Sequence, residues 1–148
     1  MTTFETGVRV ERPIDEVFAY LSDPRNLPHW NSAVRAVWRT SGQAGEVRST
    51  YVMRRELPRG RFQNELEVFA REHPVEFGIR TTSGPTPFVY QYRLFSEDGE
   101  TRVQLSAAFQ LDGAAALLGP LAGRAVKGGV DDNLAALKLI LETSARLA

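Results

Sequence analysis

Polar and apolar residues alternate along much of the chain, as expected for strands that bury one face. The first alternating segment covers residues 4–10. Further alternating segments are separated by short runs rich in Gly, Pro, Asp and Ser, which predict turns. These turns divide the region into six more predicted strands, at residues 33–40, 46–57, 62–72, 75–83, 87–96 and 101–111. Because the connections are short, we expect these six strands to form an antiparallel meander.

Two other regions follow the period of a helix. After the first strand, Pro13 opens a segment whose apolar residues share one helical face, namely Ile14, Val17, Phe18 and Leu21. Asp23-Pro24 then predicts the cap and first turn of a second short helix. A long C-terminal helix is predicted from apolar residues at three- and four-residue steps, Val126, Val130, Leu134, Leu137 and Leu141. Residues 114–124 form a predicted helical lead-in, interrupted at Gly119-Pro120.

Residues that oppose each other in a hairpin point to the same face of the sheet. Pairing the strands through their turns therefore tests whether one division of the residues into two faces fits every hairpin. The turn at Asp98-Gly99 sets Tyr92 against Leu105, and the other turns set Thr81 against Tyr90, Tyr51 against Val68, and Trp38 against Val47. One face then collects aliphatic and aromatic residues. The other collects charged residues, with predicted cross-strand pairs Arg54–Glu65, Arg71–Glu76 and Glu67–Arg80. Such a sheet needs an apolar cover, and the C-terminal helix is the candidate.

The predicted inner face also carries polar groups, which is typical of a small-molecule cavity with apolar walls. We therefore predict a ligand cavity between the sheet and the C-terminal helix. Its predicted lining residues are Trp30, Trp38, Tyr51, Met53, Asn64, Leu66, Ile79, Thr81, Phe88, Tyr90, Tyr92, Val130 and Leu134.

Simpler interpretations stay open for several of these residues. Tyr90 and Tyr92 could be core residues whose hydroxyls are satisfied at the rim. The two tryptophans could pack between the short helices and the sheet. Arg55 and Asn64 lie near strand ends beside the Gly60 turn, so exposure to solvent is the interpretation we favour for both. For Gly128-Gly129, one interpretation is close approach to the sheet or a gate, and the other is a long helix that starts after Gly129.

Composition narrows the classes of function. The 148 residues include 18 basic and 18 acidic side chains. The net charge is therefore zero and does not attract nucleic acid to the protein. The basic cluster Arg54, Arg55, Arg59 and Arg61 is interrupted by acidic residues and is interpreted as a solvated hairpin. There is no Cys, and His29 and His73 are isolated, so we expect no metal and no cofactor. No catalytic residue is identified.

The polar N-terminus does not resemble a signal peptide. The longest apolar run, Ala114 to Leu118, is too short to span a bilayer. We therefore expect a cytoplasmic protein without stable membrane insertion.

Three local motifs and the order of elements carry a family resemblance. Residues 12–21, with sequence RPIDEVFAYL, and residues 23–30, with sequence DPRNLPHW, resemble a Pro-led helix followed by an Asp-Pro segment ending on Trp. Residues 99–103, GETRV, resemble the Gly-x-Thr-x-Val start of a last strand. Together these features resemble the START-like superfamily, in its polyketide cyclase/dehydrase-like and coenzyme Q-binding-like branch. The resemblance implies an α+β helix-grip fold over residues 1–148 as one domain, in which a seven-stranded curved antiparallel sheet wraps around the C-terminal helix.

The resemblance does not specify an activity, because such folds carry binders, chaperones and enzymes. Our leading hypothesis is binding of a hydrophobic or amphipathic small molecule, such as a lipid, a quinone or a polyketide-like aromatic. The alternative is an enzyme of the cyclase/dehydrase type that uses Tyr51, Tyr90, Arg55 or bound water. A protein-interaction module is a third class, and the charged outer face argues against it. Association of the chain with a second copy of itself, as a homodimer, stays open.

Overall fold

The computed structural model describes residues 1–57, 60–111 and 113–147, without the side chains of residues 114, 115 and 145–147. It contains one seven-stranded antiparallel sheet with the order β1-β7-β6-β5-β4-β3-β2. The strands are β1 (Thr2–Val10), β2 (Val34–Ser41), β3 (Thr50–Leu57), β4 (Gly60–Glu72), β5 (Glu76–Ser83), β6 (Phe88–Glu97) and β7 (Glu100–Phe109). The helices are α1 (Ile14–Leu21), η1 (Pro24–Asn26), α2 (Leu27–Trp30), η2 (Gly113–Leu118) and α3 (Pro120–Leu147).

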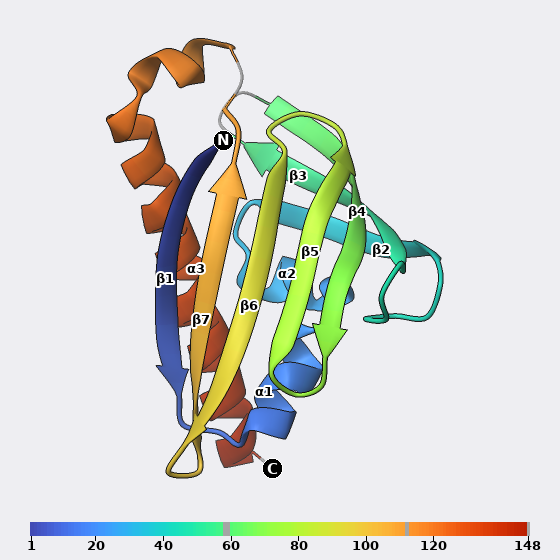
Figure 1. Ribbon diagram of the computed structural model, residues 1–148, viewed down its shortest axis with the longest axis vertical. Coiled ribbons are helices and arrows are strands. Elements are labelled where there is room, and N and C mark those ends of the chain that lie inside the picture. The colour runs from blue at the N-terminus through green and yellow to red at the C-terminus, as the bar shows by residue number, and fades with distance from the viewer. Residues whose placement is uncertain (58–59, 112, 148) are drawn as a thin grey trace.

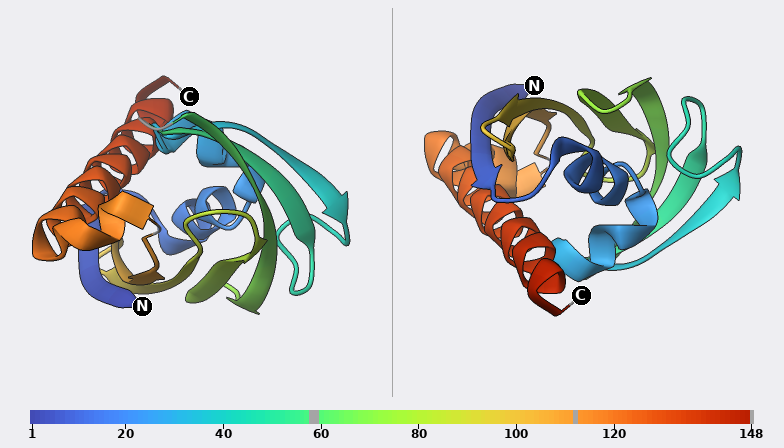
Figure 2. Two further views of the ribbon diagram at one scale, coloured as in Figure 1. Left: turned by 90° about the horizontal axis from the view of Figure 1, so that it is seen from above. Right: turned by 90° about the horizontal axis from the view of Figure 1, so that it is seen from below.

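The sheet is strongly curved, and α3 runs along its open side next to β1 (Figures 1 and 2). Helix α1 lies at the lower end of the space between them. Two hydrogen bonds tie α3 to β1: Thr6 donates to Asp131, and Lys138 donates to the Arg9 carbonyl at 2.8 Å. The predicted α+β helix-grip architecture is therefore confirmed.

Local sequence explains where the short helices begin. Pro13 precedes α1, and Asp15 and Glu16 lie in its first turn, where the helix dipole favours negative charge. One face of α1 buries Val17, Phe18 and Leu21. The Asp23 carboxylate accepts a hydrogen bond from the Arg25 backbone N–H at 3.0 Å and so caps η1. The predicted restart at Asp23-Pro24 is confirmed.

The strand registers agree with the predicted faces more closely than with the predicted partners. Across β6 and β7, Tyr92 opposes Leu105, as predicted from the Asp98-Gly99 turn. Across β4 and β5, Glu67 opposes Arg80, also as predicted. The partners differ by two residues in two other pairs of strands: Tyr90 opposes Ile79 instead of Thr81, and Tyr51 opposes Leu66 instead of Val68. A two-residue shift keeps every side chain on its face, because the side-chain period of a strand is two.

Strand β2 departs from the predicted faces. A bulge between Val34 and Ala36 adds one residue, so that Val37 packs on the core and Trp38 points outward with 38% of its surface exposed. Trp38 opposes Val52, and the Arg54 guanidinium lies 4.8 Å from its ring centroid. The predicted inward position of Trp38 and its pairing with Val47 are wrong, because β3 begins at Thr50 and residues 46–49 belong to the preceding turn.

On the outer face, only one of the three predicted ion pairs forms. Arg80 and Glu67 lie 2.8 Å apart. Arg54 opposes Gln63 instead of Glu65. Arg71 opposes Phe77 because β4 is irregular between Val68 and Ala70. Its guanidinium turns inward, 5.0 Å from the Phe18 ring centroid, and donates to the Gly45 carbonyl at 3.1 Å.

The apolar side of the sheet and the apolar side of α3 form one core. Ile79 and Tyr92 are each 4% exposed, whereas Arg80 and Arg93 are exposed on the outer face. The core continues across to α3 through its buried residues Val130, Leu134 and Leu137. The predicted cover of the sheet by the C-terminal helix is confirmed.

Helix α3 is continuous through Gly128 and Gly129, so the interpretation that the helix starts after Gly129 is wrong. Its start after Gly119 agrees with the predicted interruption, since Gly119 has φ +54° and Pro120 is the first helical residue. An added Cβ on Gly128 or Gly129 meets no described atom within 4 Å. Close approach of the helix to the sheet therefore does not explain these glycines.

We expect Gly128→Ala to stabilise the protein by about 0.5–1 kcal/mol, because Ala loses less backbone entropy in a helix than Gly and has room here. Chemical denaturation followed by circular dichroism measures the change. A decrease in the free energy of unfolding would contradict the open position of this residue on α3.

Candidate functional site

A cavity of about 290 Å³ lies between the inner face of the sheet and α3. Its apolar walls come from strand residues, including Met53, Ile79, Phe88 and Phe109, and from Leu27 on α2. Helix α3 contributes Ala125, Val126, Gly129, Val130 and Asn133. Polar groups are fewer: Asn31, Ser32, Arg55, Thr86, Tyr90, Tyr92, Gln110 and Asn133. Apolar walls with a small number of polar groups are typical of a small-molecule site.

The structure brings six of the predicted lining residues together at this cavity: Met53, Ile79, Phe88, Tyr90, Tyr92 and Val130. Leu66 and Leu134 lie in the core instead. Trp38 lies on the outer face of the sheet, so its predicted place in the cavity wall is wrong. The sequence interpretation did not include Phe109 and Val126, although each shares the face of a residue that it did include.

Three polar residues from the predicted set have structural partners. The Tyr51 hydroxyl accepts from the Gly45 N–H at 2.8 Å and donates to Ser49 Oγ at 3.0 Å. Thr81 Oγ1 accepts from the Phe88 N–H at 3.0 Å, which fixes the start of β6 against β5. Asn64 is 1% exposed and donates through Nδ2 to the Ser83 and Pro85 carbonyls. The expected solvent exposure of Asn64 is therefore wrong.

Tyr90 and Tyr92 present hydroxyl groups that make no hydrogen bond with any described residue. Burial raises the pKa of Tyr90 to about 12 and also raises the pKa of Tyr92. Both hydroxyls therefore remain protonated at neutral pH and can donate to a ligand.

The aromatic rings around these tyrosines hold them in place. The Phe88 and Tyr90 ring centroids are 4.5 Å apart, and Tyr92 packs edge-on against Trp30 at 6.5 Å. Trp30 is 5% exposed, and its Nε1 is buried without a hydrogen-bond partner in the described structure. Trp30 thus packs against Tyr92, which lines the cavity, and is not itself a lining residue.

Arg55 lies at the polar end of the cavity, and its side chain is fixed by the loop after β5. Its Nε donates to Asn64 Oδ1 at 3.0 Å, and its Nη2 donates to the Pro85 carbonyl at 2.9 Å and to Thr86 Oγ1 at 2.6 Å. Burial lowers the pKa of Arg55, and the nearby Tyr90 opposes that shift. The expected solvent exposure of Arg55 holds only in part, because the side chain is half-buried against the loop around Pro85.

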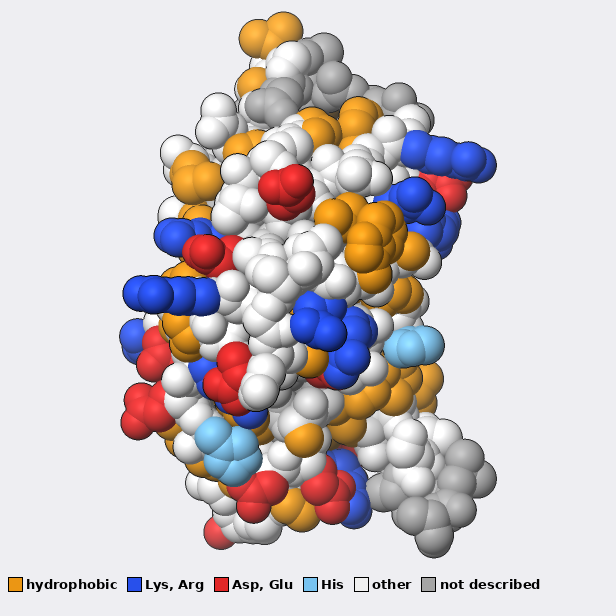
Figure 3. All heavy atoms as spheres, turned by 90° about the vertical axis from the view of Figure 1, so that its right-hand side faces the viewer, with side chains coloured by type: hydrophobic (Ala, Val, Ile, Leu, Met, Phe, Trp, Pro, Cys, Tyr) orange, Lys and Arg blue, Asp and Glu red, His pale blue; other side chains and the backbone are white. Residues whose placement is uncertain are grey.

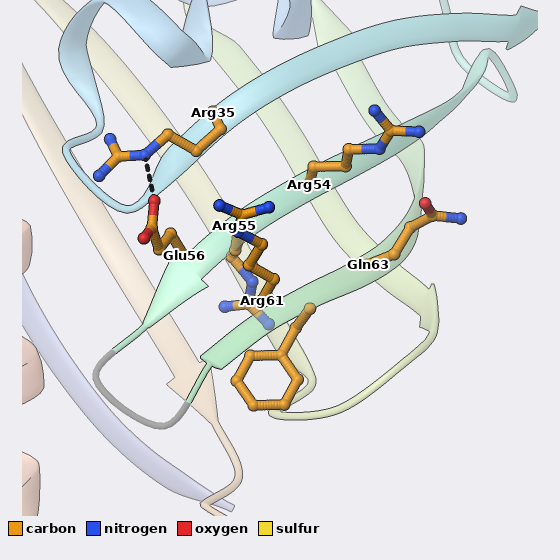
Figure 4. Close-up of a pocket in the computed structure, with 7 residues that line it drawn as sticks. Arg35, Arg54, Arg55, Glu56, Arg61 and Gln63 are labelled. Atoms are coloured by element: carbon orange, nitrogen blue, oxygen red, sulfur yellow. Dashed lines mark hydrogen bonds and ion pairs between the residues drawn. The ribbon is translucent and has the colours of Figure 1, made fainter.

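A second hollow of about 550 Å³ lies over β2, β3 and β4 (Figure 4). Exposed polar and charged residues dominate its lining, including Arg54, Arg61 and Gln63. Arg35 is paired with Glu56 at 2.9 Å, and the half-buried Arg55 borders both this hollow and the inner cavity. Because these side chains remain hydrated, this surface offers less shelter to an apolar ligand than the inner cavity does.

The histidines do not contribute to either hollow. Both are exposed, and they are the two pale blue groups in Figure 3, separated on the surface. His73 packs edge-on against Phe18 at 5.1 Å between ring centroids. In the described part of the chain, no group of three His, Cys, Asp or Glu residues is placed to hold a metal ion.

The sequence model of the family described as "Polyketide cyclase / dehydrase and lipid transport" matches residues 1–142. The chain belongs to this family. Among solved structures, a conserved protein from Geobacillus kaustophilus is similar to this polyketide cyclase/dehydrase family member with a TM-score of 0.83 and 14% identity, covering 97% of each chain. A START superfamily protein from Mycobacterium smegmatis gives a TM-score of 0.75 at 14% identity, covering 95% of this chain and 97% of that one.

A third similar structure is the di-domain ARO/CYC StfQ from the steffimycin biosynthetic pathway, with a TM-score of 0.74 and 15% identity. The alignment covers 97% of this family member but 52% of StfQ. At these identities the likeness establishes a shared fold. No curated protein matches the sequence. Among the described residues, no helix combines the length and apolar character needed to cross a bilayer.

Proposed function

We propose that this protein binds a hydrophobic or amphipathic small molecule in the cavity between the sheet and α3. The observation that carries the proposal is an apolar cavity of about 290 Å³ whose lining includes Tyr90 and Tyr92, two tyrosines whose hydroxyls make no hydrogen bond with any described residue. Hydrogen-bonding groups in an apolar wall are usually satisfied, and here a ligand would satisfy them while burying its apolar surface. The family description, which includes lipid transport, supports the same class of ligand.

The size of the cavity narrows the class further. Small-molecule pockets usually occupy about 300–1,000 Å³, so this one suits a compact ligand of up to about three rings or a short acyl chain. Burial of about 200 Å² of apolar surface would contribute about 5 kcal/mol before the loss of ligand freedom is subtracted. We therefore expect dissociation constants in the micromolar range or weaker for apolar ligands that lack specific polar groups.

Titration with N-phenyl-1-naphthylamine, a neutral apolar probe whose fluorescence rises away from water, tests this proposal. We expect saturable binding at one site per chain, and native mass spectrometry of the same mixture should show one bound probe. Lipid extraction of the purified protein then identifies any ligand acquired during expression. Absence of saturable binding of the probe and of any extracted ligand would contradict the proposal.

A second candidate function is catalysis of the cyclase/dehydrase type, which the family description and the similarity to StfQ favour. In that case the protonated Tyr90 and the Arg55 cation would stabilise an enolate oxygen, since both are hydrogen-bond donors on the cavity wall. Turnover of a poly-β-ketone substrate distinguishes the two functions. Wild-type activity in the Arg55→Met, Tyr90→Phe double variant would exclude these residues as the catalytic groups.

A further inference from the structure

Arg55 is a half-buried arginine with no carboxylate among the described residues to balance its charge. Among the described residues, its hydrogen bonds go only to neutral oxygens, on Asn64, Pro85 and Thr86. Several other arginines pair with acids, for example Arg9 with Glu100 at 2.7 Å and Arg80 with Glu67 at 2.8 Å. A buried charge is costly unless an opposite charge or strong hydrogen bonds compensate it. The position of Arg55 therefore favours a negatively charged partner from outside the chain.

The hydrogen-bonding capacity of Arg55 is only partly used. Its Nε proton is taken by Asn64, and its Nη2 donates to Pro85 and Thr86. Its Nη1 makes no hydrogen bond within the described structure. A guanidinium binds oxyanions through N–H groups such as those of Nη1. The hydrogen bonds of Nε and Nη2 already hold the Arg55 side chain, so less conformational entropy is lost when an oxyanion binds.

The residues around Arg55 favour a ligand that carries a negative charge. Of the described residues that line the cavity, Arg55 alone carries a formal charge. Tyr90 lies on the same wall, close enough for the Arg55 charge to act on its hydroxyl, and it can donate a second hydrogen bond. The Phe88 ring, which also lines the cavity, has its centroid 5.8 Å from the guanidinium carbon.

We propose that the ligand of this cavity is a small amphipathic acid, whose carboxylate or similar oxyanion binds Arg55 Nη1 and the Tyr90 hydroxyl while its apolar part contacts the walls. This inference rests on the proposed binding function and adds the charge of the ligand. It also assigns Arg55 a role in specificity, beyond its contacts with the loop at Pro85. A purely structural Arg55 would hold that loop without distinguishing acids from their neutral analogues.

The test compares two probes of nearly equal shape, 2-naphthoate and 2-naphthamide, at neutral pH by isothermal titration calorimetry. We expect wild-type protein to bind the acid at least about tenfold more tightly than the amide, as for a charge-assisted hydrogen bond to a half-buried guanidinium. The Arg55→Met variant should lose this preference and bind the amide within about threefold of wild type. The Arg55→Lys variant, which retains the charge without the fork, should keep part of it.

A matched control is Arg61→Met, which removes one arginine from the exposed side of β4 in the same hairpin. Its preference for the acid should equal that of wild type. Equal affinities of the two probes in wild-type protein would overturn the inference without any variant having to fold, and so would an unchanged preference in Arg55→Met. If 2-naphthamide and N-phenyl-1-naphthylamine also fail to bind, the binding function itself is wrong.

Discussion

Replacing Val126 with Trp is expected to weaken binding of N-phenyl-1-naphthylamine by at least about tenfold. Val126 is half-buried on α3 and borders both the core and the cavity of about 290 Å³. An indole ring at this position occupies the space that a bound ring would fill, so the probe loses most of its apolar contact. Fluorescence titration measures the change in affinity, and circular dichroism checks that the variant is folded.

The matched control for this variant is Leu139→Trp, which places the same ring on the outer side of α3, where Leu139 is 67% exposed. It should bind the probe as wild type does. Overpacking can itself destabilise a core by about 1–3 kcal/mol, so Gly129→Leu provides a second variant from the same wall, at a position with open space for a Cβ. Wild-type affinity in both folded wall variants would show that the probe binds elsewhere.

Leu134→Ala is expected to lower the free energy of unfolding by about 3 kcal/mol. Leu134 is 1% exposed and connects α3 to the core beneath the sheet. Truncation removes buried methyl groups and leaves a void that the rigid sheet fills only in part. A loss of this size is a large share of the stability of an ordinary domain, and urea denaturation measures it directly.

Leu139→Ala is the control for this second variant, because the same atoms are removed from an exposed position on the same helix. Its effect should stay within about 0.5 kcal/mol of wild type. Similar losses for the two variants would mean that α3 does not pack on the sheet through the face that contains Leu134.

The faces of the strands could be predicted from sequence because each buried side chain leaves an alternating pattern. The register across β6 and β7 could also be predicted, since Asp98 and Gly99 both adopt positive φ, 54° and 79°, as a two-residue hairpin turn requires. The registers of β3 with β4 and of β5 with β6 could not be predicted. A shift by two residues, such as Ile79 opposing Tyr90, leaves the pattern of apolar positions unchanged, so the pattern carries no information about it.

The candidate site was harder to predict where irregular backbone decides the outcome. The β2 bulge turns Trp38 outward, and no residue type in β2 marks the inserted position. Asn64 is buried and Arg55 is half-buried because both contact the loop around Pro85, which is 21 residues from Asn64 and 30 residues from Arg55 in sequence. Helix residues such as Val126 join the cavity through packing that only the tertiary structure determines.

The outward turn of Trp38 gives the molecule two indoles in opposite surroundings. Trp38 lies in solvent beside Arg54, whereas Trp30 is enclosed and touches the Tyr92 ring at the cavity wall. Because indole emission depends on contact with water, the two residues emit at different wavelengths, and a dissolved quencher such as iodide reaches mainly Trp38. The protein therefore carries an intrinsic optical reporter beside its cavity and a second indole on the far side of the sheet, whose emission we expect ligand binding to affect less.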